Sequence, residues 1–170
     1  MQRQSRLIVV MRHAKAEQLG PTDLERELSP RGREDAAGSG GWLAEQQIVP
    51  DHALVSAAVR TRQTWESVAE AAGWSLEPTF DQGLYAAGPD TTFDLVRETP
   101  DEARVLLVIG HNPTIAVVAQ LLDDGSGDEA ADQGMTAGFP TSALAVFEYD
   151  GAWADLQPAS ARLTTFHSPR

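Results

Sequence analysis

The most constraining feature of this sequence is an uninterrupted apolar run that leads directly into two side chains able to carry positive charge. The run is Leu7–Met11, in the stretch LIVVMRHAKAE, and Arg12 and His13 follow it at once. Because the run is continuous rather than alternating, it predicts a strand buried on both faces, as in the parallel sheets of α/β proteins. A second stretch, RVLLVIGHNP, repeats this arrangement and leads through Gly110 to His111.

Helical patterns separate the apolar runs. The segment LSPRGREDA predicts a helix that starts at Pro30 with Ser29 as its N-cap. Gly38–Gly41 lies inside this helix, and because glycine weakens a helix, an irregular middle is expected. Further expected elements are strands at His52–Ser56 and Leu76–Phe80, a helix over Arg60–Ala72 stopped by Gly73, a short helix capped by Asp90, and a helix from Asn112-Pro113 through Leu122. This alternation predicts an α/β fold with a mainly parallel sheet.

The last third of the chain departs from the alternation. Asp123–Phe139 is polar, rich in glycine and aperiodic, which predicts a mobile loop that is either functional or disordered. The stretch ALAVFEYDGAWADL predicts a hairpin that turns at Asp150-Gly151, and ARLTTF predicts a last strand. Because no repeat or linker occurs, we expect a single domain over residues 1–170.

The composition argues against several classes of protein. The absence of cysteine excludes a disulfide framework and a thiolate metal site. The net charge of -12 falls almost wholly after residue 62, and this acidity argues against a nucleic-acid partner. No apolar run approaches the roughly 18 residues of a membrane span, and the run near the N-terminus is too short for a signal peptide. We therefore expect a cytoplasmic protein without a membrane partner; the oligomeric state stays open.

Three predicted strands end in side chains that suit an anion. The carboxyl ends of parallel strands share one edge, where open α/β sheets bind their ligands. The first strand delivers Arg12 and His13, the second leads to Arg60, and the stretch RVLLVIG leads to His111. Asn112 stands at the start of a helix, whose N-terminus favours anions. Since arginine binds phosphate oxygens in pairs, these residues predict a phosphate site.

Two histidines and two arginines support phosphoryl transfer without a metal. One imidazole can attack phosphorus to form a covalent phosphoenzyme. The arginines can neutralise the transferring group, and the second histidine can donate a hydrogen bond to it. A zinc site would need a third ligand at a typical spacing, and none occurs, so no metal and no cofactor are expected. His52 and His167 stand apart from these motifs and are expected to be structural or surface residues.

The motifs resemble those of the histidine phosphatase superfamily. MRHAKAE is similar to its Arg-His-Gly/Ala signature, and LSPRGREDA, SAAVRTRQT, GHNP and FPTSALAVFE resemble its later motifs in the same order. The short chain and the Arg-His-Ala form most resemble the SixA-like branch, the phosphohistidine phosphatases. The resemblance implies a three-layer α/β/α sandwich and a phosphohistidine intermediate. It implies His13 as the nucleophile, Arg12 and Arg60 as phosphate ligands, and His111 as the second histidine of the pocket.

The resemblance leaves the proton donor open. Many larger members use an acidic residue located after the next strand, which makes Asp81 the better candidate here and Glu77 the other. A turn or capping role for Asp81 is the competing interpretation, and the SixA-like branch works without a dedicated acid. Arg62 and Lys15 lie beside the motifs, and a solvent-facing role is the simpler interpretation of both.

Three functions follow from these residues. The leading hypothesis is a phosphatase that removes the phosphoryl group of phosphohistidine from a partner protein. The second is a phosphomonoesterase that acts on a small phosphorylated metabolite with the same residues. The third, in a different class, is a phosphate-binding module without catalytic activity. A mutase is less favoured, because the chain lacks the large insertions that would enclose a released intermediate.

Overall fold

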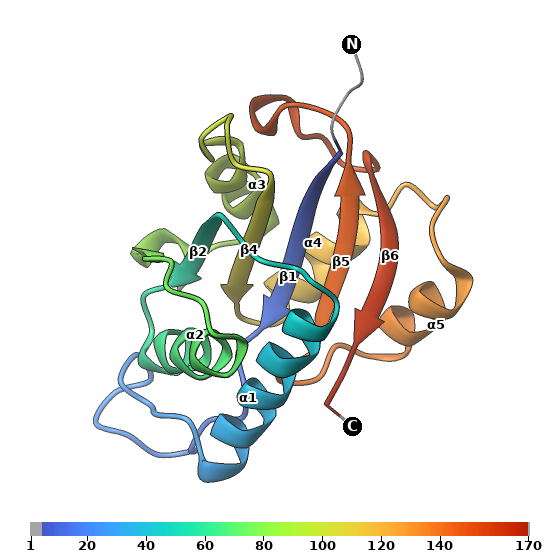
Figure 1. Ribbon diagram of the computed structural model, residues 1–170. Coiled ribbons are helices and arrows are strands. Elements are labelled where there is room, and N and C mark those ends of the chain that lie inside the picture. Colours follow the sequence, from blue (N-terminus) through green and yellow to red (C-terminus); the bar gives the residue numbers. More distant parts are fainter. Residues whose placement is uncertain (1–4, 170) are drawn as a thin grey trace.

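A six-stranded sheet lies between two layers of helices in the computed structural model, which describes residues 5–169 (Figure 1). The strands are β1 Arg6–Arg12, β2 His52–Ser56, β3 Thr79–Asp81, β4 Val105–Gly110, β5 Leu144–Tyr149 and β6 Ala161–His167. The helices are α1 Pro30–Glu45, α2 Val59–Ala72, α3 Pro89–Arg97, α4 Thr114–Leu122 and α5 Glu129–Ala137. Two short 3₁₀ turns are η1 Gln82–Leu84 and η2 Trp153–Asp155.

The sheet is mainly parallel, with β1 in its interior. The strand order is β3-β2-β4-β1-β5-β6. The pairings among β1, β2, β3 and β4 are all parallel, whereas β5 runs antiparallel to both β1 and β6. The predicted α/β class is therefore confirmed, and the antiparallel pairings are confined to the C-terminal part of the sheet.

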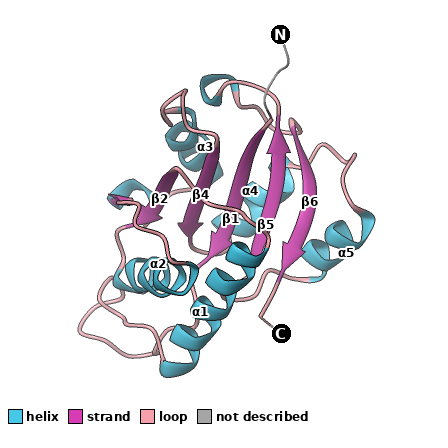
Figure 2. Ribbon diagram, viewed as in Figure 1, coloured by secondary structure: helices cyan, strands magenta, loops and turns pink. Residues whose placement is uncertain are grey.

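Each face of the sheet packs against its own helices, as the continuous apolar run predicted. In β1, Ile8 and Val10 belong to one core with α3, α4 and α5, while Val9 and Met11 belong to another with α1 and α2. All four side chains are almost completely buried. Figure 2 shows α1 and α2 in front of the sheet and α4 behind it. The three-layer α/β/α sandwich is confirmed.

The register brings the ends of three parallel strands to one level. Arg12 at the end of β1 lies opposite Gly110 at the end of β4. Val55 of β2 lies opposite Ile109, the residue before Gly110. The residues that follow β1, β2 and β4 therefore emerge together at one edge of the sheet.

Helix α1 is continuous, so the predicted irregular middle is wrong. The physical reason lies in its contact with α2. A Cβ atom added to Gly40 would lie 2.3 Å from the carbonyl oxygen of Val68, whereas a Cβ added to Gly38 would meet nothing within 4 Å. The missing side chain at Gly40 thus allows the two helix backbones to approach closely, and the packing offsets the poor helix propensity of the glycine.

Three predicted boundaries shift. Asp90 does not cap α3, because Gly88 is the N-cap and Pro89 occupies the first turn. Strand β3 covers only Thr79–Asp81. Helix α4 starts at Thr114, after a cis peptide bond between Asn112 and Pro113. Among residues 5–169, no helix has both the length and the apolar character needed to cross a membrane.

The predicted mobile loop over Asp123–Phe139 is wrong, because the segment contains α5. The Asp128 carboxylate caps this helix by accepting a hydrogen bond of 2.9 Å from the Ala131 N–H. The Asp128 N–H in turn donates to the Leu163 carbonyl of β6. Helix α5 is short, and only its residues Ala131 and Met135 are buried. Two buried positions do not produce a helical hydrophobic periodicity that can be recognised in the sequence. The segment packs as structure beside β6.

The C-terminal hairpin is longer than predicted. Strands β5 and β6 pair, but β6 begins at Ala161, and η2 occupies the connection after Asp150-Gly151. Trp153 in η2 is completely buried and donates a hydrogen bond of 2.9 Å from its indole nitrogen to the Ala103 carbonyl. The AWADL stretch is therefore a core-filling turn and not the second strand of a tight hairpin.

The α1–α2 contact makes a prediction about two glycines of one helix. Gly38→Ala should raise the free energy of unfolding by about 0.5–1 kcal/mol, because alanine favours the helix and its methyl group meets open space. Gly40→Ala should lower it by about 1–3 kcal/mol, because the methyl group meets the α2 backbone. Urea denaturation of both variants is the measurement. Equal effects of the two substitutions would contradict the close helix contact.

Candidate active site

His13 follows β1 directly and is held in one tautomer. Its backbone N–H donates a hydrogen bond of 3.0 Å to the Gly110 carbonyl, and the residue is only 8% exposed. The ring nitrogen Nδ1 lies 2.7 Å from the Ala14 carbonyl oxygen. Because a carbonyl only accepts, Nδ1 carries the proton, and the lone pair of the neutral ring lies on Nε2. The site therefore presents His13 with a free nitrogen nucleophile.

The surroundings keep His13 neutral. Burial lowers its pKa from 6.5 to about 3, against the opposing effect of the hydrogen bond to Ala14. Repulsion by His111 in its protonated form and by the charges of Arg60 and Arg12 contributes to this lowering of the pKa. A protonated imidazole has no lone pair to donate, so this environment suits a nucleophile.

His111 faces His13 from the end of β4. The two ring centroids are 5.3 Å apart. The His111 Nε2 atom lies 2.7 Å from the hydroxyl oxygen of Ser56, at the end of β2, while its Nδ1 atom is buried and has no hydrogen-bond partner among the described residues. Burial, followed by the charge of Arg60, lowers the pKa of His111 to about 4. Ser56 therefore holds the His111 ring beside that of His13.

Arg12 is fixed by the segment that precedes β5. Its Nη1 atom donates to the Phe139 carbonyl at 3.1 Å, and the Asn112 Nδ2 atom donates to the same carbonyl at 2.9 Å. The next turn of this segment returns to His13, because the Ser142 N–H donates to the His13 carbonyl. The chain after α5 thus forms one wall of the site.

Arg60 lies in the first turn of α2 and its side chain is only 8% exposed. Its Nη1 atom donates to the backbone carbonyl of Asp23 at 2.7 Å, and its Nη2 atom lies 3.1 Å from the Asp23 carboxylate. The guanidinium also lies 5.9 Å from the ring centroid of Tyr85. Arg60 reaches the site as predicted, but a partner that the sequence did not indicate holds it there.

Asn112 has a positioning role. Its Oδ1 atom accepts a hydrogen bond of 3.2 Å from the Ala116 N–H and so caps α4, and its Nδ2 atom is the donor to Phe139. The Ile115 N–H bonds the His111 carbonyl. Two N–H groups of the first turn of α4 therefore donate to His111 and Asn112 and are not available to a ligand. Phosphate binding by Asn112 stays a prediction.

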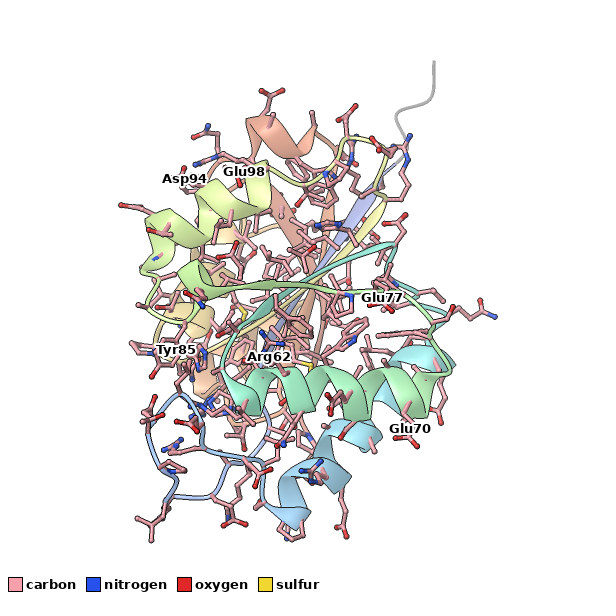
Figure 3. All side chains as sticks on the ribbon, turned by 90° about the vertical axis from the view of Figure 1, so that its left-hand side faces the viewer. Arg62, Glu70, Glu77, Tyr85, Asp94 and Glu98 are labelled. Atoms are coloured by element: carbon pink, nitrogen blue, oxygen red, sulfur yellow. The ribbon has the colours of Figure 1, made fainter. Side chains whose placement is uncertain are left out.

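Asp81 has the capping role in a turn that was the alternative to acting as a general acid. It caps η1 by accepting a hydrogen bond of 2.6 Å from the Gly83 N–H. Its place at the end of β3, opposite Ser56 of β2, puts it at the same edge of the sheet. Glu77 is exposed and lies well away from Tyr85 in Figure 3. Proton donation by Asp81 stays a prediction.

The remaining sequence candidates have other contacts. Arg62 stacks 4.0 Å above the ring of Phe80 and donates from Nε to the Ala57 carbonyl, on the side of the molecule that Figure 3 shows. Lys15 is exposed and borders an open hollow with Arg31. His167 stacks on Trp42, and His52 lies at the far end of β2 from the site.

Sequence reasoning missed three residues of this edge, namely Ser56, Asp23 and Tyr85. Ser56 had a signal, since it is the polar residue that ends the apolar run of β2. Asp23 and Tyr85 had none, because both lie in irregular segments whose approach to Arg60 depends on the folded structure.

The arrangement has the chemistry of a phosphoryl-transfer site. Two arginines lie with two histidines whose neutral forms are favoured by burial, and the described residues bind Nδ1 of His13 but leave Nδ1 of His111 without a hydrogen-bond partner. Among residues 5–169, no group of three or more His, Cys, Asp or Glu side chains is arranged to hold a metal ion. The fold therefore brings two arginines and two histidines, side chains that suit phosphate binding and phosphoryl transfer, to one edge of an α/β sheet.

Comparison with known proteins identifies the family. The profile of the histidine phosphatase superfamily (branch 1) matches residues 8–85. An uncharacterized protein of Mycobacterium tuberculosis is 39% identical over 162 residues, which cover 94% of this chain and 100% of that protein. The chain belongs to the histidine phosphatase superfamily, and membership supports a phosphatase with a phosphorylated substrate.

Two further similarities point to one branch. The structure of a proposed phosphohistidine phosphatase SixA from Nakamurella multipartitia is 32% identical and superposes with a TM-score of 0.86, covering 97% of this chain and 96% of that one. A phosphohistidine phosphatase SixA homolog from Haemophilus influenzae is 28% identical over 149 residues, which cover 72% of this chain and 91% of that protein. The resemblance to the SixA-like branch is thus confirmed.

The lowered pKa values predict an acid-sensitive fold. Histidines of the unfolded chain take up protons near pH 6.5, whereas folded His13 and His111 do so only near 3 and 4. Between these values the unfolded chain binds more protons, so the free energy of unfolding falls as the pH drops through this window.

His111→Asn should reduce the slope of the free energy of unfolding against pH, because it removes one of the two histidines with a lowered pKa. His52→Asn, at the other end of β2, is the control for the loss of an imidazole outside the site. Urea denaturation from above pH 6.5 down to pH 4 measures the slope. An identical slope in wild type and His111→Asn would count against the buried neutral histidine.

Proposed function

We propose that this protein is a phosphohistidine phosphatase that acts on a partner protein through a covalent intermediate on His13. The observation that carries the proposal is the fixed tautomer of His13, whose Nδ1–H is engaged by Ala14 and whose Nε2 lone pair is left free. The similarity to proteins named as SixA supports the choice of substrate.

The reaction has two steps at one phosphorus atom. In the first, Nε2 of His13 bonds to phosphorus, and the bond from phosphorus to the leaving nitrogen breaks with its electron pair going to that nitrogen. In the second, water attacks the phosphoryl-His13 intermediate, and Nε2 leaves with the electron pair of its bond to phosphorus. The products are the free histidine of the partner and inorganic phosphate, and one water molecule is consumed.

The other residues stabilise charge during both steps. Arg12 and Arg60 neutralise the phosphoryl oxygens as their charge is redistributed. The Ser56 hydroxyl and Nε2 of His111 share a hydrogen bond of 2.7 Å, which holds the His111 ring beside that of His13, where we expect His111 to donate a hydrogen bond to a phosphoryl oxygen. Both histidines act in the neutral form that burial favours.

The carboxylates at this edge favour phosphohistidine over an alcohol ester. Asp23 pairs with Arg60 and accepts from the Tyr85 hydroxyl, and these bonds hold its pKa below the ordinary value, so it is ionised and cannot supply a proton. Asp81 is engaged in capping η1. A leaving alkoxide needs a proton from a placed acid, whereas a leaving imidazole can be protonated on its second nitrogen.

The covalent intermediate can be tested directly. Incubation with a phosphohistidine protein labelled in its phosphoryl group should transfer label to this chain in an acid-labile, base-stable form. His13→Ala should lose both the label and the turnover, because no other nitrogen replaces Nε2. His52→Ala is the matched control and should retain both. A His13→Ala protein with near-normal turnover would overturn the mechanism, and a wild type that shows neither label nor turnover would favour a phosphate-binding module.

The substrate class can be tested by the leaving group. We expect kcat/KM to fall in the order phosphohistidine, aryl phosphate, alkyl phosphate, because the leaving groups have pKa values of about 6.5 for imidazole and 10 for phenol, and alkoxides resemble water at about 15.7. Asp81→Asn should leave phosphohistidine cleavage unchanged, since asparagine can keep the cap on η1. A wild type that prefers alkyl phosphates, with selective loss of this activity in Asp81→Asn, would establish the small-molecule phosphomonoesterase instead.

A further inference from the structure

Asp23 lies in the irregular segment between β1 and α1, yet it holds a residue of the phosphate site by two groups. Its backbone carbonyl accepts from Nη1 of Arg60 at 2.7 Å, and its carboxylate accepts from Nη2 at 3.1 Å. The Asp23 side chain is 55% exposed, whereas that of Arg60 is 8% exposed. An exposed carboxylate therefore fixes a buried guanidinium from its solvent side.

The carboxylate is itself fixed by neighbours. The Tyr85 hydroxyl donates to Oδ2 of Asp23, and the Nε atom of Arg26 lies 3.5 Å from Oδ1. The Tyr85 ring meets the His111 ring edge-on at 5.6 Å and lies beside Arg60. Figure 3 shows Tyr85 next to the segment that follows β1. Asp23 and Tyr85 thus connect Arg60 to His111.

The backbone anchors the same contact. The Val59 N–H at the start of α2 donates to the Leu24 carbonyl at 3.0 Å, one residue after Asp23. Helix α2 has no side-chain cap, so this carbonyl satisfies a free N–H group of its first turn. The segment that carries Asp23 is therefore tied to the helix that carries Arg60.

We propose that Asp23 is a positioning residue of the phosphate site, which orients the Arg60 guanidinium toward the phosphoryl group, and that Tyr85 holds the Asp23 carboxylate in place. A guanidinium has five N–H donors, and Asp23 uses one on each terminal nitrogen. The second N–H of each terminal nitrogen therefore remains for phosphoryl oxygens. This inference rests on the proposed phosphatase function.

The chain offers a matched control at the opposite end of β1. Arg6 is 10% exposed in its side chain and donates from Nη2 to the carbonyl and to the carboxylate of Asp101, at 2.8 and 3.0 Å. Asp101 is 80% exposed, and Arg6 lies 5.6 Å from the ring centroid of Trp153. Both pairs join a buried guanidinium to the carbonyl and the carboxylate of an exposed aspartate, although Nη1 of Arg6 also donates to the Gly151 carbonyl. Of the two arginines, only Arg60 lies at the edge where β1 and β4 end.

The test compares Asp23→Ala, Asp23→Asn and Asp101→Ala. Asp23→Ala should reduce kcat/KM for phosphohistidine by about 10- to 100-fold, the usual cost of a misplaced group in a reactive site. KM should rise as well as kcat fall, because Arg60 contacts the phosphoryl group in the bound substrate and in the transition state. Asp23→Asn should lie in between, since its amide oxygen still accepts. Asp101→Ala should remain near wild type, and thermal melts should show all three folded.

Two further measurements separate positioning from a purely structural role. Orthovanadate inhibition should weaken by about tenfold in Asp23→Ala, in parallel with the loss of rate. Asp23→Ala should have no added effect on the rate in an Arg60→Ala background. The Arg60→Ala substitution already removes the interaction through which Asp23 acts, and a double-mutant cycle measures this coupling. Additive effects would overturn the inference.

The failures of the two proposals can be told apart. A wild type without turnover on any phosphorylated substrate would overturn the phosphatase, and calorimetric binding of inorganic phosphate to wild type and Asp23→Ala would still test the positioning role. An active wild type in which Asp23→Ala behaves like Asp101→Ala would overturn positioning alone. Tighter phosphate or vanadate binding in Asp23→Asn would show that the carboxylate competes with the ligand for Arg60, which also contradicts positioning.

Discussion

The hydrogen bond from the His13 N–H to the Gly110 carbonyl joins the ends of two neighbouring parallel strands, and the whole site depends on this alignment. It extends the register of β1 and β4 by one residue beyond Arg12, so His13 and His111 leave the sheet side by side. The alignment requires β1 to sit in the sheet interior with helices on both faces. The continuous apolar run of β1 is the sequence counterpart of that requirement.

The same alignment explains which parts of the structure were predictable. Strands such as β1 and β4 are visible because burial on both faces demands an unbroken apolar run, and Arg12, His13 and His111 are visible because they follow such runs directly. Helix α5 was missed because Ala131 and Met135 alone face the core. Asp23 and Tyr85 were missed because they meet across 62 residues of sequence through irregular segments, where no periodic pattern predicts a contact.

Burial serves the chemistry at a cost to the fold. Enclosing His13 and His111 beside two arginines removes water from both rings and disfavours their charged forms, which in the proposed mechanism leaves His13 ready as a nucleophile at neutral pH. The folded state then binds fewer protons than the unfolded chain below pH 6.5 and becomes less stable there. The property that prepares Nε2 of His13 for attack is therefore the same property that makes the fold sensitive to acid.

The two clamped arginines show why position, and not contact, assigns a role. Arg6 and Arg60 are both buried, and each donates to the carbonyl and the carboxylate of one exposed aspartate, while Arg6 also donates to the Gly151 carbonyl. Neither Nε has a partner among the described residues. The clamp is thus a general way for this fold to hold a buried guanidinium in one orientation. At the amino end of β1 the orientation serves packing beside Trp153. At the carboxyl end the same kind of clamp holds Arg60 beside Tyr85, whose ring meets that of His111, so in our proposal an ordinary structural clamp becomes part of a phosphate site.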